Sequence, residues 1–189
     1  MSQDMQSRTQ TLPCEIATLS VDTKVRERTL NVSIQFKTTD GDIGKILWFV
    51  SRERTRVNFT INDDSLILIS VKDDYRNPDV SVTSDREMSR NIPKLSLVFT
   101  SALTAALEDR ELTRTLSLGV DGNGTTQSSC DTACGAAGSA AAAAGAVALA
   151  GACTGATLGA AAPGCVLGGA GIGGAAGFLV GAGCSWLFC

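Results

Sequence analysis

Six cysteines in the last third of the chain are the residues whose type and spacing point most directly to chemistry. Gaps of 3, 18, 11, 18 and 4 residues separate them, so the spacing is nearly a palindrome. A cysteine cluster of this density favours disulfide bonds, as in small stapled scaffolds. The six residues are Cys130, Cys134, Cys153, Cys165, Cys184 and Cys189.

Other cysteine chemistry is compatible with part of this pattern. A zinc ion could be held by the four thiolates of Cys130, Cys134, Cys184 and Cys189. Cys153 and Cys165 would then have no role. Enzymatic thioether crosslinks and free buried thiols are further alternatives. The seventh cysteine, Cys14, stands alone, and we expect it to be a free thiol.

The equal 18-residue gaps predict two helical arms that fold back on each other. Each arm would be about 28 Å long at 1.5 Å per residue. Pro163-Gly164 lies in the 11-residue middle and favours a turn there. Six cysteines allow 15 pairings. The palindrome favours the nested set: Cys130 with Cys189, Cys134 with Cys184, and Cys153 with Cys165.

Charge divides the chain into two parts. All 16 Lys and Arg residues and all 19 acidic residues lie at or before Asp131, and the 58 residues from Thr132 to Cys189 carry no charge. The predicted organisation is therefore a flexible start (1–20), a small α+β leader or partner domain (21–121), a Gly/Ser/Thr linker containing the cleavage region (122–129), and a Cys-rich apolar peptide (130–189).

The composition argues against catalysis and nucleic-acid binding. The chain has no histidine, which excludes Ser-His-Asp and Cys-His catalysis and every histidine-containing metal site. The net charge is −3, and the sequence has no block of basic residues of the kind that binds nucleic acid. The acidic pairs Asp63-Asp64 and Asp73-Asp74 fall between apolar runs, as solvated turn residues do. We expect no enzyme activity, no catalytic residue, no cofactor and no metal.

Hydrophobic periodicity predicts the elements of the charged part. Alternation of apolar and polar residues predicts strands at 29–36, 54–62 and 65–72. A helix is expected at 43–50, another from Asn91 onward, and a last strand at 112–120. The helix at 43–50 would present one apolar face made of Ile43, Ile46, Leu47 and Val50.

Glycines recur every four residues in the second arm, which places them along one stripe of a helix. Such a stripe lets another backbone approach closely. Eight glycines between Cys165 and Cys184 would cost an isolated helix about 8 kcal/mol. Disulfides worth about 2–4 kcal/mol each, or a lipid environment, would offset this. The stripe consists of the helix-packing glycines Gly169, Gly173, Gly177 and Gly181. Val180 lies along it, and Ile172, Phe178 and Leu179 fall on the far side.

The uncharged tail also has features of membrane segments. Trp186 and Phe188 are predicted membrane contacts, and Trp186-Leu187-Phe188 would serve equally well as the cap of a small core. An uncharged span of about 20 residues can be a membrane anchor. The alternative to a released peptide is therefore a glycine-zipper transmembrane hairpin that holds the charged domain at a membrane surface.

A family resemblance arises from these features of the tail. A charged N-terminal part, a Gly/Ser/Thr boundary and an uncharged Gly/Ala-rich segment with many cysteines resemble the precursors of cysteine-rich halocins, the archaeal bacteriocins. The likeness covers Cys130 to Cys189, with runs such as Gly151-Ala152-Cys153-Thr154-Gly155 and the cysteine at position 189. It implies an exported killing peptide that is cut from a precursor, with the N-terminal part as leader or immunity protein.

The sequence thus predicts the precursor of a secreted, membrane-active antimicrobial peptide. Its partners would be the target-cell membrane, a processing protease and a dedicated exporter, and the N-terminal domain would contact the peptide. The segment Met1 to Thr11 is polar and lacks a secretory or twin-arginine signal. We therefore expect synthesis in the cytoplasm and secretion of the C-terminal peptide by a dedicated route.

Overall fold

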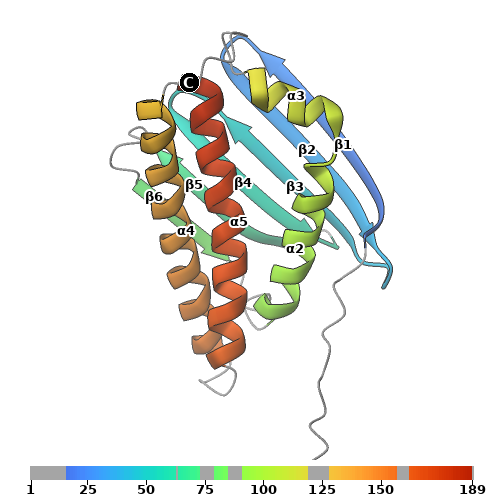
Figure 1. Ribbon diagram of the computed structural model, residues 1–189. Coiled ribbons are helices and arrows are strands. Elements are labelled where there is room, and N and C mark those ends of the chain that lie inside the picture. Colours follow the sequence, from blue (N-terminus) through green and yellow to red (C-terminus); the bar gives the residue numbers. More distant parts are fainter. Residues whose placement is uncertain are drawn as a thin grey trace, which may run out of the picture.

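The computed structural model describes residues 16–62, 64–72, 79–84, 91–118, 128–156 and 162–188. Within these ranges the chain forms a six-stranded sheet and four helices (Figure 1). The strands are β1 (Ile16–Arg26), β2 (Thr29–Thr38), β3 (Ile43–Val50), β4 (Arg54–Ile61), β5 (Asp64–Lys72) and β6 (Asp79–Ser84). The helices are α2 (Ile92–Ala106), α3 (Arg110–Leu118), α4 (Ser128–Ala156) and α5 (Ala162–Phe188).

The sheet is an antiparallel meander in which each strand pairs with the next along the chain. Tight turns make this possible: Glu27 between β1 and β2 and Gly41 between β2 and β3 both have positive φ. Alternate residues of β2 are buried toward the helices, while those between them face away. The buried apolar residues of β2 are Leu30, Val32, Ile34 and Phe36, and the pattern continues to the buried Thr38.

The predicted helix at 43–50 is wrong, because these residues form strand β3. Apolar residues occur here both at helical spacing and in alternation, and the alternation prevails. Ile46, Trp48 and Val50 are buried, whereas Ile43 and Leu47 are exposed. Pairing with β2 on one side and β4 on the other satisfies the backbone of the segment and sets this period of two.

The predicted strand at 112–120 is also wrong over its described residues, which belong to helix α3. The Asp109 side chain accepts a hydrogen bond from the Leu112 backbone N–H at 2.9 Å and so caps the helix. Leu112 is buried, and Leu116, one turn later, packs partly against the core. The cap and the spacing of four residues were sequence signals of a helix.

The other N-terminal elements follow the predictions with shifted ends. The strands at 29–36, 54–62 and 65–72 correspond to β2, β4 and β5, and the helix after Asn91 is α2. Strand β1 begins at Ile16, inside the stretch expected to be a flexible start, because its residues pair with β2. Strand β6 was not predicted. Asp63 and the pair Asp73-Asp74 lie outside the described residues.

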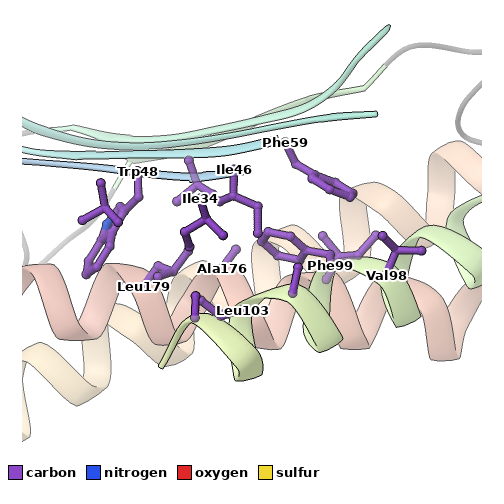
Figure 2. Packing of buried hydrophobic residues seen from close by; sticks show 14 of the residues in the cluster. Ile34, Ile46, Trp48, Phe59, Val98, Phe99, Leu103, Ala176 and Leu179 are labelled. Carbon is purple, nitrogen blue, oxygen red and sulfur yellow. The ribbon is translucent and has the colours of Figure 1, made fainter. Parts of the chain in front are cut away.

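All four helices lie on the same side of the sheet (Figure 1). Between the layers runs one continuous hydrophobic core that includes residues of the sheet, of α2 and of both C-terminal helices. In Figure 2, Trp48, Ile34, Ile46 and Phe59 of the sheet point toward Leu179 of α5 and the residues of α2. The Phe59 and Phe99 rings lie 4.9 Å apart.

The predicted fold class, an α+β N-terminal part followed by a disulfide-linked helical hairpin, is confirmed. The two parts share the core and form one packed body. The predicted cleavage region lies mostly outside the described residues, and α4 begins at Ser128. Pro163 and Gly164 fall in the first turn of α5, where proline is tolerated, and the connection between the helices precedes them.

A polar cluster joins the β2–β3 turn to the end of β4 and to α2. Asn62 donates a hydrogen bond from Nδ2 to Asp42 Oδ1 at 3.0 Å, and its Oδ1 accepts one from the Ile43 backbone N–H. The Lys94 ammonium lies 3.1 Å from Asp42 Oδ2. The hydrogen bond from Asn62, followed by that from Lys94, holds the pKa of Asp42 below its ordinary value of 3.8.

We expect Asp42→Asn to lower the free energy of unfolding by about 1 kcal/mol at pH 7, because it removes the charge that these donors stabilise. Because the pKa of Asp42 is lower in the folded state than in the unfolded chain, its charge stabilises the folded state fully at pH values above the unfolded pKa near 3.8. This stabilisation is lost as the pH falls through the lowered pKa. Urea unfolding at pH 7 and at pH 2 measures it, and the two proteins should converge at the lower pH. A control is Asp22→Asn, which removes an exposed pair with Lys24.

Candidate functional site

Two disulfides join the helices of the C-terminal hairpin. Cys134 and Cys184 have Cα atoms 5.3 Å apart, and Cys153 and Cys165 have theirs 5.5 Å apart. All four residues are buried. Two pairs of the predicted nested set are therefore confirmed, and neither Cys134 nor Cys184 is left as a thiolate for zinc. The third predicted pair, Cys130 with Cys189, lies outside the described side chains and stays a prediction, and Cys14 lies outside the described residues.

The glycine stripe of α5 faces α4. A methyl group added at Gly169 would lie 2.8 Å from the carbonyl oxygen of Ala146, and one at Gly173 would lie 2.5 Å from that of Ala142. At Gly177 it would collide with the carbonyl oxygen of Gly138, and at Gly181 it would touch that of Cys134. The backbones of the two helices therefore approach too closely for a side chain at Gly169, Gly173 or Gly177, whereas the contact at Gly181 would be an ordinary van der Waals contact.

Two adjacent glycines of α5 should respond oppositely to alanine. Gly173→Ala should lower the free energy of unfolding by roughly 1–2 kcal/mol, because overpacking against α4 exceeds the gain in helix propensity. Gly174 has no atom within 4 Å of the added methyl, so Gly174→Ala should be neutral or stabilise by up to about 1 kcal/mol. Chemical denaturation of both variants tests this. Equal shifts for the two would show that the helices do not approach along the stripe.

The face of α5 toward the sheet carries large apolar side chains at intervals of seven residues. Ile172, Leu179 and Trp186 are buried there, in the same core as Leu149 of α4. Burial of each is worth about 1.5–3 kcal/mol relative to exposure. An apolar interior therefore holds the hairpin in the full chain, in addition to its disulfides. The glycine cost of about 8 kcal/mol applies to an isolated helix, which lacks this contribution from the sheet and α2.

Trp186 and Phe188, the predicted membrane contacts, have different surroundings. Trp186 is 1% exposed and belongs to the shared core, whereas Phe188 is 49% exposed. In the folded full chain Trp186 therefore has the role of a core residue, which was the alternative that the sequence left open. Of the three residues expected on the far side of the stripe, Phe178 is exposed, whereas Ile172 and Leu179 are buried in the shared core. Leu167, which is also on α5, is exposed as well.

A second row of α5 glycines contacts the N-terminal part of the chain. Methyl groups at Gly168 and Gly171 would collide with Pro93 and Ser96 of α2, and one at Gly183 would lie 2.8 Å from a methyl group of Val50 in β3. Sequence reasoning missed these three positions. Helix α5 contains more glycines than the four-residue stripe accounts for. This excess was the feature of the sequence that indicated a second close contact.

From Thr132 onward the hairpin has no charged residue, so its outward face is uncharged over this range. An open groove of about 520 Å³ runs between α4 and α5, lined mainly by glycine, alanine and serine, with Phe178 at its side. By length and composition, the segments Cys134–Cys153 and Leu167–Phe188 are each long and apolar enough to cross a membrane. Within the described residues no group of three His, Cys, Asp or Glu side chains is placed to hold a metal ion.

The arrangement thus combines a hairpin that is uncharged from Thr132 onward, two covalent crosslinks and a large apolar face that the sheet and α2 cover. Among the described residues of the hairpin, the chemistry is that of the disulfides. No family model matches the chain, no match was found among curated proteins, and none was found among solved structures.

Proposed function

We propose that the chain is the precursor of a secreted, membrane-active antimicrobial peptide that is released from its C-terminus. The observation that carries the proposal is the crosslinked hairpin, which is uncharged from Thr132 onward. Its covalent loops would persist after the chain is cut before Cys130, whereas the N-terminal part would retain its sheet and α2.

The rest of the fold fits this proposal. Disulfides persist in oxidising surroundings, which agrees with export. The N-terminal part covers the apolar face of the hairpin and so would keep it soluble until cleavage. The proposed partners are a processing protease, a dedicated exporter and the membrane of the target cell, and the proposed N-terminal role is that of leader or immunity protein.

Intact mass spectrometry of culture supernatant tests this proposal. The expected product is a fragment that begins near Cys130 and is lighter by about 6 Da than its reduced formula, since each of three disulfides removes two hydrogens. A fragment lighter by about 4 Da would limit the crosslinks to the two seen in the structure. Full-length protein found solely in membranes, with free thiols, would refute the proposal.

The length and apolarity of the two hairpin helices favour a second candidate, a non-enzymatic protein anchored in a membrane by a glycine-zipper hairpin. In that case the helices would leave the sheet and cross the bilayer, and the cysteines would be dispensable. Extraction of cell membranes with alkaline carbonate separates the candidates. An anchor stays in the membrane as the full chain with or without its cysteines, and a precursor yields a soluble fragment.

A further inference from the structure

The hairpin has two apolar faces. The rest of the chain covers the inner face and leaves the outer face exposed. The inner face, toward the sheet and α2, carries Leu149, Ile172, Leu179 and Trp186, all nearly inaccessible. The outer face is mainly glycine and alanine, from which Leu167 and Phe178 project. Separation from the N-terminal part would expose the large inner side chains to water together.

We infer that this inner face is the surface through which the released hairpin contacts lipid acyl chains, so that the N-terminal part masks the membrane-binding surface itself. The inference rests on the proposed release of the hairpin. Ile172, Leu179 and Trp186 form a stripe about 21 Å long on α5 at 1.5 Å per residue. Trp186, near the C-terminal end of this stripe, has an aromatic ring with a polar N–H, which suits the boundary between acyl chains and headgroups.

Lipid is the favoured occupant because of the charge and shape of the face. The hairpin has no charged residue after Asp131, so acyl chains can cover the inner face without burying an ion. The glycines Gly168, Gly171 and Gly183 leave hollows shaped for Pro93, Ser96 and Val50 of the N-terminal part. Flexible acyl chains adapt to such hollows whatever their shape, whereas the side chains of a second hairpin, fixed on rigid helices, would have to match their positions.

Photolabelling of a chain whose hairpin has the wild-type sequence tests the assignment. The full chain, with a specific protease site introduced at 122–129, is mixed with phosphatidylcholine–phosphatidylglycerol vesicles whose acyl chains carry a diazirine. The mixture is irradiated before and after cleavage, and labelled residues are found by mass spectrometry. We expect labels on Ile172, Leu179 and Trp186 after cleavage and no labels on these residues before it. Labels confined to Leu167 and Phe178 would overturn the inference while leaving a membrane-active peptide.

Two leucines of α5 provide a matched pair of variants. After cleavage, Leu179→Asn should weaken vesicle partitioning roughly tenfold, and Leu167→Asn should change it less than about threefold. Circular dichroism of each uncut variant checks that it folds, and the photolabelling result stands without either variant. Equal losses of vesicle partitioning in the two variants would overturn the inference, because the outer face would then contact lipid as much as the inner face does. Absence of both labelling and vesicle binding would refute the inference and the proposed function together.

Discussion

Replacing both Cys134 and Cys184 with alanine should lower the free energy of unfolding of the full chain by about 4 kcal/mol, because this disulfide closes a loop with a sequence separation of 50. The Cys153→Ala/Cys165→Ala variant should lose less, about 3 kcal/mol, since its loop has a separation of 12. In both cases the main effect is a larger conformational entropy of the unfolded chain.

Guanidinium unfolding of both double variants, with Cys14→Ala as the control, measures these losses. The control removes the cysteine that has no predicted partner, and its midpoint should match that of the wild type. Under reducing conditions, the wild type should have the same midpoint as a variant that lacks both pairs. Identical midpoints for oxidised and reduced wild-type protein would contradict the account of the crosslinks.

Leu179→Ala should destabilise the full chain by about 2–5 kcal/mol, because Leu179 is 1% exposed and lies between α5 and the sheet (Figure 2). The same change at Leu167, which is 75% exposed on the same helix, should shift the free energy of unfolding by less than about 0.5 kcal/mol. Helix propensity rises slightly in both variants, so the difference between them reports the packing of α5 on the sheet.

Thermal and urea unfolding of the Leu179 and Leu167 variants provide the comparison, with tryptophan fluorescence as a second probe of the core. Trp48 and Trp186 both lie in this core, so loss of packing should change their emission in parallel with the unfolding curve. A Leu179→Ala protein as stable as the Leu167→Ala protein would show that the hairpin does not dock on the sheet.

The hairpin was the most predictable part of the molecule. The equal gaps between cysteines favoured the nested set among the 15 possible pairings, and the structure contains its pairs Cys134–Cys184 and Cys153–Cys165. The four-residue glycine repeat likewise has one consequence on a helix, which is a face that another backbone can approach. Both inferences depend on local periodicity and need no knowledge of the rest of the fold.

The relation between hairpin and sheet could not be predicted in the same way. The burial of Trp186 depends on where the sheet lies, and single-sequence patterns give no distance between residues far apart in the chain. The eight residues of β3 contain apolar residues at helical spacing and also an alternation of buried and less buried residues that is typical of a strand. Pairing with β2 and β4 decides between them, and that pairing is tertiary information.

We propose that the C-terminal hairpin becomes membrane-active when it is separated from the N-terminal part. Release of a dye from lipid vesicles, followed while a specific protease cuts the full chain at 122–129, tests this claim directly. We expect no dye release before the cut, release that follows the cut, and its loss when the disulfides are reduced first. Equal release before and after the cut, or none at any stage, would contradict the claim.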